Sequence, residues 1–258
     1  MNKKTIPKYI LILIILFIGY KSYYLIKYNI PKEDYAKEEI FKDKITINND
    51  NKNQYEMIKY GGLSCRNNFK DFVINDKYDY DVNISTTDTK PIMYWKKNKQ
   101  GETTAAIVFD KWMQYYNILT DGRIESINTS KKDELHQDEY FGEKDKEKFL
   151  KDNNIKNDID LLYYVKNNYY LNNNIFTSNH KIKEHNIINL FTTLYLIGTR
   201  KITLIDGDLQ GFIVNLTDNF KEIHLFDNDE QYIITLSREE LTNEVYLNDF
   251  LKTITINK

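Results

Sequence analysis

The longest apolar pattern is an unbroken run from Tyr9 to Tyr20, which follows three lysines. As a helix its 12 residues extend only about 18 Å, short of the roughly 30 Å hydrocarbon core of a bilayer. The apolar pattern resumes after Lys21, and a helix over residues 5–26 is long enough to span that core. We expect Lys8 and Lys21 to extend toward the two membrane interfaces.

A cleaved signal peptide is the main alternative, and a buried core helix is a second one. Signal peptidases require small residues at the last and third-last positions before the cut. A cut after Gly19 puts Phe17 in the third-last position, and a cut after Ser22 puts Tyr20 there. These bulky residues favour an uncleaved signal anchor within residues 1–30, behind a basic tail. No cysteine is near the run, which excludes a lipoprotein anchor.

The orientation of this single-pass anchor is weakly specified, because lysines flank the apolar run on both sides. A short basic tail before a first hydrophobic segment usually stays inside, and long domains cross a membrane largely regardless of charge. We therefore expect a cell-membrane protein whose soluble domain is extracytoplasmic.

Charged and polar positions dominate residues 31–53, which we interpret as a stalk followed by a polar loop. Residues 54–258 then form the predicted soluble domain. Within it, residues 129–157 are dense in charge and poor in apolar side chains, as in a solvated loop or an exposed helix. This segment is also the best candidate for a boundary between a front and a back part of the domain.

Short apolar or alternating runs predict mostly strands in the front part. The predicted strands cover residues 72–74, 82–84, 92–95 and 103–109. Two further runs, 115–119 and 123–127, flank Thr120-Asp121-Gly122. Asp and Gly tolerate the backbone conformations of tight turns, so these two runs predict a hairpin.

The back part switches from the helical period to the strand period. Helices are predicted over residues 158–170 and 178–197, and strands over residues 202–205, 212–216, 222–226 and 232–236. The short loops between these strands predict an antiparallel meander.

The C-terminal stretch matches a helix. Ser237 and Glu240 have the spacing of a capping box, and the apolar face that follows consists of Leu247, Phe250, Leu251 and Ile254. Residues 253–256 can return to a strand. The whole pattern predicts an α+β fold, an antiparallel β-sheet with helices packed on one face, preceded by one N-terminal transmembrane helix.

The composition indicates a globular domain and restricts the classes of molecule that it can bind. The chain has 258 residues, of which 41% are hydrophobic and 29% charged, as in proteins with a real core. Its heavy use of Asn, Lys, Ile and Tyr is typical of an AT-rich, low-GC bacterial genome. Five lysines and no acid lie in residues 1–30, so the net charge of −2 leaves −7 for residues 31–258. Such an acidic domain is unsuited to nucleic acid and would suit a basic protein partner.

The single cysteine, Cys65, cannot form an internal disulfide and is one candidate for chemistry. It follows Gly61 and Gly62, which can form a sharp turn, and it precedes Arg66, which can lower the pKa of a thiol. Together with a histidine base, Cys65 would make an envelope hydrolase. The competing interpretation is a buried structural cysteine.

Histidines and turn carboxylates are the other candidates for a site. The histidines are His136, His180, His185 and His224. His180 and His185 lie about 140° apart on a helix, so they do not share a metal ion as an i, i+4 pair would. The carboxylates in predicted turns are Asp206, Asp208, Asp227, Asp229 and Glu230. Turn chemistry explains them better than Ca²⁺ binding, because the twelve-residue calcium loop is missing.

Aromatic side chains gather in two places, one with Tyr94, Trp95, Trp112, Tyr115 and Tyr116, the other with Tyr163, Tyr164, Tyr169 and Tyr170. They suit core packing first and a protein interface second. We assign no catalytic, metal or cofactor-binding residue and no cofactor. We therefore expect a membrane-anchored binding module. The alternatives are the hydrolase based on Cys65 and a structural subunit of a membrane complex.

Overall fold

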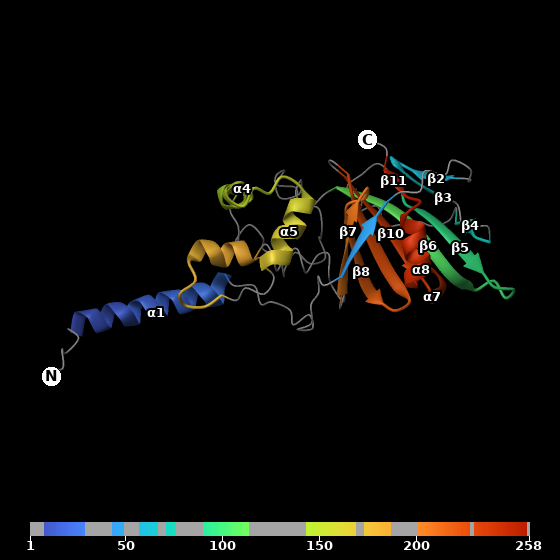
Figure 1. The fold of residues 1–258 in the computed structure, drawn as a ribbon. Coiled ribbons are helices and arrows are strands. Elements are labelled where there is room, and N and C mark those ends of the chain that lie inside the picture. Colours follow the sequence, from blue (N-terminus) through green and yellow to red (C-terminus); the bar gives the residue numbers. More distant parts are fainter. Residues whose placement is uncertain are drawn as a thin grey trace.

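An eight-stranded, mostly antiparallel sheet with helices forms the centre of the computed structural model of this protein (Figure 1). The structure describes residues 8–28, 43–48, 57–66, 71–75, 90–113, 143–168, 173–186, 201–227 and 230–256. The predicted α+β class, with a largely antiparallel sheet and helices, is confirmed.

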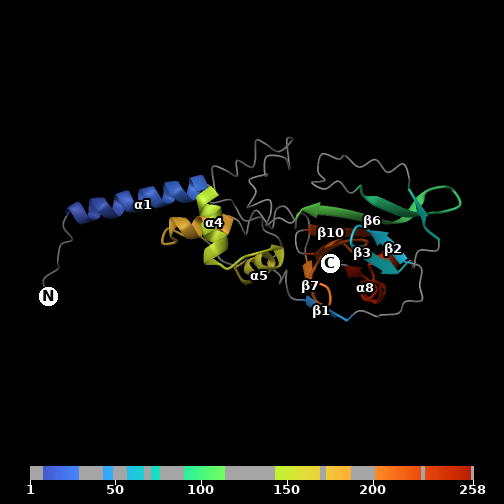
Figure 2. The same ribbon diagram turned by 90° about the horizontal axis from the view of Figure 1, so that it is seen from above.

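Helix α1 (Lys8–Tyr28) extends away from the sheet (Figures 1 and 2). Its apolar side chains from Ile10 to Ile18 are exposed. Among the described residues, α1 is the one helix that is both long enough and apolar enough to cross a membrane. The predicted N-terminal helix is thus confirmed from residue 8 onward, whereas residues 5–7 lie outside the described part.

Four strands form the predicted meander. They are β7 (Lys201–Gly207), β8 (Gly211–Thr217), β9 (Phe220–Phe226) and β10 (Glu230–Ser237), each antiparallel to the next. Apolar side chains on both faces of these strands are buried, which fits a sheet covered on two sides. The four sequence predictions in this region are confirmed.

Three strands continue the sheet beyond β10, namely β6 (Thr103–Met113), β5 (Ile92–Lys97) and β4 (Val73–Ile74). They confirm the strands predicted near residues 72–74, 92–95 and 103–109. The strand predicted at residues 82–84 and the hairpin predicted over residues 115–127 lie outside the described residues.

Strand β1 (Asp43–Ile47) forms the opposite edge and pairs in parallel with β7. The sequence placed these residues in the stalk and polar loop, whereas the structure makes them part of the sheet. At the end of β7 the backbone of Gly207 comes so close to the Ile47 carbonyl that a Cβ atom would overlap it. The φ angle of Gly207 is +106°, which side chains disfavour. Glycine is therefore required here both by the close contact and by the backbone conformation.

A second sheet of three strands lies next to the first. It consists of β2 (Met57–Tyr60), β3 (Leu63–Arg66) and β11 (Thr255–Ile256), with β3 in the middle. Gly61 and Gly62 form the two-residue loop between β2 and β3, where Gly61 has a φ angle of +57°. The sequence did not predict this hairpin, although a strand at the end of the chain is confirmed.

The last helices are α7 (Glu239–Thr242) and α8 (Glu244–Leu251). The predicted capping box is wrong, because Ser237 belongs to β10 and its hydroxyl accepts a hydrogen bond from the N–H of Ala106 at 2.9 Å. The cap of α8 is Asn243 instead, whose side-chain oxygen accepts a hydrogen bond from the N–H of Tyr246 at 2.9 Å. The predicted apolar face of this stretch is buried at all four positions: Leu247, Phe250, Leu251 and Ile254.

The main core lies between one face of the large sheet and a layer made of α8 and the second sheet. A cross-strand row of Ile213, Ile223, Ile234 and Phe109 lines the sheet side. Phe250 from α8 belongs to the same cluster and is fully buried. This packing fixes α8 over the sheet, which matters for the pocket described below.

A second helical group lies between α1 and the sheet (Figures 1 and 2). It consists of α4 (Glu143–Asp152), α5 (Asp158–Asn168) and the helical residues 179–186. The helix predicted over residues 158–170 is confirmed as α5, and the one predicted over residues 178–197 is seen over 179–186. Residues 187–197 lie outside the described part. The charged segment 129–157 contains α4, whose Phe149 and Leu150 are buried.

Candidate functional site

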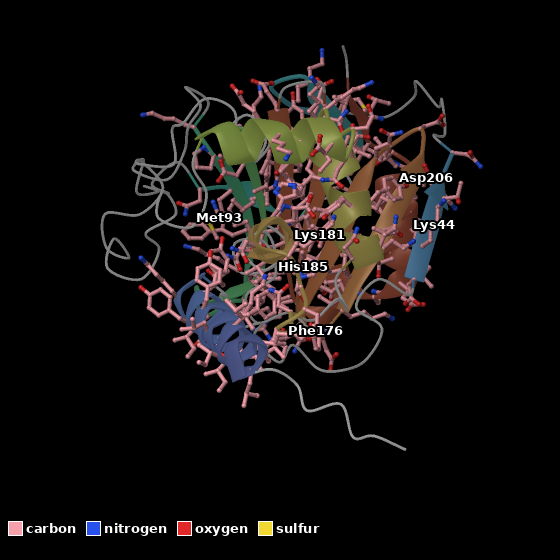
Figure 3. The ribbon with its side chains drawn as sticks, turned by 90° about the vertical axis from the view of Figure 1, so that its left-hand side faces the viewer. Lys44, Met93, Phe176, Lys181, His185 and Asp206 are labelled. Carbon is pink, nitrogen blue, oxygen red and sulfur yellow. The ribbon has the colours of Figure 1, made fainter. Side chains whose placement is uncertain are left out.

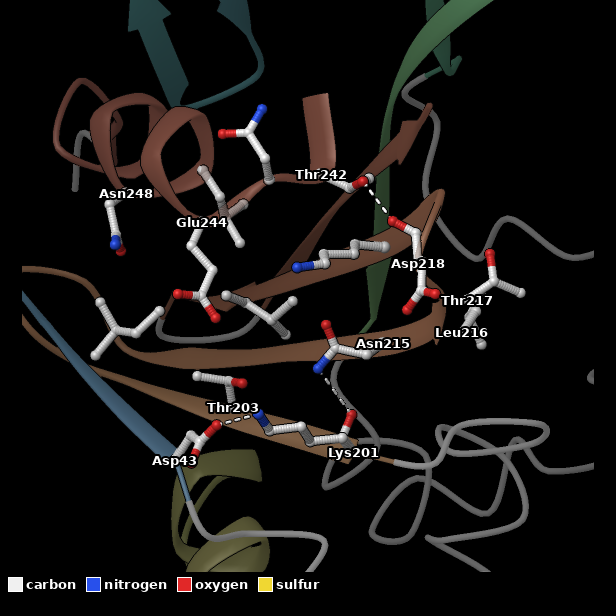
Figure 4. A pocket seen from close by; sticks show the side chains of 15 residues that line it. Asp43, Lys201, Thr203, Asn215, Leu216, Thr217, Asp218, Thr242, Glu244 and Asn248 are labelled. Carbon is white, nitrogen blue, oxygen red and sulfur yellow. Dashed lines mark hydrogen bonds and ion pairs between the residues drawn. The ribbon is translucent and has the colours of Figure 1, made fainter. Parts of the chain in front are cut away.

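A pocket of about 930 Å³ opens between α8 and the part of the large sheet that is formed by the neighbouring strands β1, β7, β8 and β9 (Figure 4). Its position follows from the strand register. On the core face, the row with Ile213 and Ile223 is apolar, whereas two residues further along the strands the row is Lys201, Asn215 and Lys221. The sheet face therefore turns polar where the packing of α8 ends, and the pocket forms there.

Lys221 is the pocket residue that best indicates what kind of ligand the pocket binds. Its side chain is half-buried, and burial lowers the pKa of its ammonium group below the usual value of 10.5. The Glu244 carboxylate opposes this shift, whereas the Lys201 ammonium adds to it. Among the described residues, no hydrogen bond or ion pair within 4 Å is found for Lys221. A partly desolvated cation without a close counter-ion is costly, and a bound anion would relieve that cost.

Lys201 differs from Lys221 because it forms an ion pair with Asp43 on β1. Its backbone carbonyl also accepts a hydrogen bond from the side chain of Asn215 at 3.2 Å (Figure 4). The Lys201 ammonium is therefore engaged within the protein, and Lys221 is the cation that faces the pocket without such a partner.

Helix α8 supplies the opposite wall. Figure 4 shows Glu244 and Asn248 extending from the helix toward the strands. The side-chain oxygen of Asn248 is buried and has no hydrogen-bond partner among the described residues. An unsatisfied buried acceptor is unfavourable, and a donor group of a ligand would satisfy it. The hydroxyl of Thr242 donates to the backbone carbonyl of Asp218 at 2.6 Å and ties the helical wall to the strand loop.

The pocket thus combines a cation, carboxylates and amides over an apolar floor of Ile45, Ile213 and Leu247. Of the described residues that line it, none is a cysteine or a histidine. Its chemistry suits recognition of a polar molecule by charge and hydrogen bonding.

Cys65 lies elsewhere, in the centre of the second sheet, and is fully buried. Burial raises the pKa of its thiol to about 12, so the thiol is protonated at neutral pH. The two preceding glycines form a hairpin turn and do not expose the sulfur. These findings give the hydrolase alternative no support and agree with a structural cysteine.

Three histidines lie in the described residues, each in a different setting. His180 lies 3.2 Å from the carboxylate of Glu184, and the ring of His185 contacts the Asn173 side chain at 2.5 Å. His224 is buried on the other face of the large sheet, where it stacks on Phe212 and lies 2.6 Å from the Gln231 side chain. His136 is outside the described residues. Within those that are described, no group of His, Cys, Asp and Glu is suited to hold a metal ion.

The turns after β7 and β9, which carry the acidic residues, lie together at one end of the meander. The turn after β7 and the turn after β9 are joined by a hydrogen bond from the Phe226 N–H to the Gln210 carbonyl, 2.9 Å long. Asp206 forms an ion pair with Lys44 at 2.5 Å, and this contact, together with the Gly207 N–H, lowers the pKa of its carboxyl group. Its charge is thus engaged within the sheet edge. Asp229 is outside the described residues.

The aromatic clusters divide between the core and the surface. Tyr94 packs edge-on against Phe109 in the core, with 6.0 Å between ring centroids, and Tyr164 packs edge-on against Phe149 at 5.1 Å. The Lys97 ammonium lies over the ring of Trp95, 4.1 Å from its centroid. Tyr163 is exposed. The side chain of Trp112 and the residues Tyr115, Tyr116, Tyr169 and Tyr170 are outside the described part.

Of the residues that line the pocket, only Leu247 was named individually from the sequence, as part of an apolar face. The available signal was the polar residue at the end of each meander strand, such as Lys201, Asn215 and Lys221, which breaks the apolar pattern at matching positions. Comparison of the chain with protein-family models, curated proteins and solved structures gives no match.

Proposed function

We propose that the chain is a membrane-anchored binding module whose pocket between α8 and strands β7–β9 holds a small zwitterionic ligand. The observation that carries this proposal is Lys221, a half-buried cation that faces a pocket of about 930 Å³ without a close counter-ion. The soluble domain is extracytoplasmic in this proposal, and α1 holds it in the cell membrane.

The ligand class follows from the two walls of the pocket. Lys221 on the strand side would bind an anionic group such as a carboxylate. Glu244 and the unpaired oxygen of Asn248 on the helix side would accept hydrogen bonds from an ammonium group. Free amino acids and short peptides carry both groups at the required small size. A basic protein partner, expected from the net charge, stays a prediction.

Calorimetric titration of the full chain in detergent with a panel of free amino acids and dipeptides tests the proposal. We expect at least one amino acid or dipeptide to bind and the Lys221→Met variant to lose that binding. The matched control is Lys59→Met on β2, which removes an exposed lysine outside the pocket and should bind as the unchanged protein does. Equal binding by both variants, or no binding of any amino acid or dipeptide, would contradict the proposal.

A further inference from the structure

Lys21 of α1 is buried, contrary to the expectation that it extends toward the membrane interface. Its side chain is 8% exposed, and its ammonium donates to the Thr177 carbonyl and to the Asn179 side-chain oxygen, both at 2.7 Å. The Asn179 amide in turn donates to the Tyr20 hydroxyl at 3.0 Å. The helical group therefore docks on α1 at Tyr20 and Lys21, well before the helix ends at Tyr28.

This docking shortens the part of α1 that can lie in lipid. From Lys8 to Gly19 the helix has 12 residues, which extend about 18 Å against the roughly 30 Å of a hydrocarbon core. A span that is too short is accommodated by thinning of the bilayer or by burial of flanking groups in it. Either response brings the docked segment, residues 173–179, to the boundary between lipid headgroups and acyl chains.

That segment carries a large exposed apolar side chain. Phe176 is 82% exposed, and Figure 3, which looks along α1 from the N-terminal side of the molecule, shows it beside α1. In Figures 1 and 2 this segment reaches further along α1 toward the N-terminus than α4 or α5 does.

The turn that presents Phe176 is held by its own hydrogen bonds. The Asn174 side-chain oxygen accepts from the Phe176 N–H at 2.9 Å, and the Asn174 carbonyl accepts from the Thr177 N–H at 3.0 Å. The Ser178 hydroxyl then accepts from the Lys181 N–H at 3.2 Å and caps the helical residues 179–186. The backbone is thus fixed with Phe176 directed outward, which leaves its ring without a partner among the described residues.

We propose that Phe176 inserts into the same bilayer that α1 crosses, so that residues 173–179 form a second membrane contact. This inference rests on the membrane anchor of the proposed function. Aromatic side chains are favoured at the headgroup level, and the neighbouring Tyr20 and Tyr23 on α1 suit the same depth. With two contacts, the domain would be held against the membrane in one orientation.

Fluorescent labelling of the full-length protein in lipid nanodiscs tests this contact. Because Cys65 is fully buried, a cysteine introduced at the surface can be labelled selectively in the folded protein. We would label Phe176→Cys, Val245→Cys and Leu13→Cys with the same environment-sensitive dye and add lipids with a nitroxide quencher near the headgroup end of the acyl chain. Val245 is the matched control, since it is an apolar residue 74% exposed on α8, away from α1. Leu13 reports on the anchor itself.

We expect the dye at position 176 to emit at shorter wavelength and to be quenched several-fold more than the dye at position 245. Equal, water-like signals at 176 and 245 together with strong quenching at 13 would overturn the second contact and leave the anchor intact. Absence of quenching at position 13 would overturn the anchor and, with it, this inference.

Discussion

The large sheet and the helical group beside α1 bury different kinds of side chain. The sheet buries a large apolar cluster against α8 and the second sheet, and buried polar residues such as His224 and Gln231 are few beside it. In the helical group, the buried residues include Asp158, Glu184, His185 and Asn186. Glu184 is only 2% exposed, yet its carboxylate contacts His180 and Lys181. The helical group also buries apolar side chains such as Phe149, but a larger share of its buried residues is polar and needs hydrogen-bonding or charged partners.

This difference indicates a division of tasks. The apolar core stabilises the sheet, and this stability offsets the cost of polar groups in the pocket that have no close partner. The polar network of the helical group instead provides the donors and acceptors that hold Lys21 of α1. The following three variants test the comparison, from the largest expected effect to the smallest.

Truncation of Phe250 should cost the most. Phe250→Ala removes a fully buried ring from the core of the sheet and should lower the free energy of unfolding by about 4 kcal/mol. Urea unfolding followed by near-ultraviolet circular dichroism measures this loss. Val245→Ala on the same helix removes an exposed side chain and should change stability by no more than about 0.5 kcal/mol. Similar losses in the two variants would show that α8 does not pack on the sheet as described.

Removal of the buried carboxylate should affect the helical group alone. Glu184→Ala leaves His180, Lys181 and Asn153 without their shared acceptor and should cost about 2 kcal/mol. Hydrogen exchange read by mass spectrometry should then rise in residues 143–186 and stay unchanged in β7–β10. Glu147→Ala, on the exposed side of α4, is the control. Faster exchange throughout the sheet would contradict the separation of the two regions.

The smallest effect concerns the pH dependence of stability at the pocket. Because burial lowers the pKa of Lys221 in the folded protein, the unfolded chain binds the proton more tightly. The folded state is therefore penalised at neutral pH, and this penalty disappears as the pH rises from the lowered pKa toward 10.5. Lys221→Met should melt slightly higher than the unchanged protein at pH 7, and the gap should narrow as the pH approaches 10.5. Thermal unfolding at a series of pH values measures this gap.

A Lys221→Met variant that melts lower than the unchanged protein at pH 7 would mean that the ammonium has a stabilising partner. In that case the pocket would not contain an unfavourable, unpaired charge. The proposal that the stable core of the sheet supports an unsatisfied polar pocket would then be contradicted.

The meander and α5 could be predicted from sequence because local signals decide them. Each strand of the meander has its own apolar run and its own turn. Asn157 lies directly before α5 and caps it, because its side-chain oxygen accepts a hydrogen bond from the Asp160 N–H at 3.0 Å. The hairpin of β2 and β3 was missed because each strand has only four residues and because β3 also needs a distant partner, β11. Ser64 on β3 contacts Thr255 on β11, 191 positions away.

The pocket and the docking of α1 could not be predicted for a related reason. Lys201, Asn215 and Lys221 become neighbours only through the register of three strands. Lys21 has the local pattern of a residue at a membrane interface, and its true acceptors belong to residues 177–179, far along the chain. The capping box failed because the Ser237 hydroxyl is used by the neighbouring strand β6.

The parallel pairing of β1 with β7 has a consequence for the order in which the chain folds. Asp43 pairs with Thr203, so the partner of β1 leaves the ribosome 160 residues after it, when α1 has long emerged. Until β1 adds to β7, that edge exposes unpaired backbone next to the apolar Ile202 and Leu204, and open edges of this kind recruit other chains. Edge closure is therefore a late step, which follows the synthesis of α1 and of most of the domain. A chain that starts at residue 54 lacks β1 and would keep the aggregation-prone edge open.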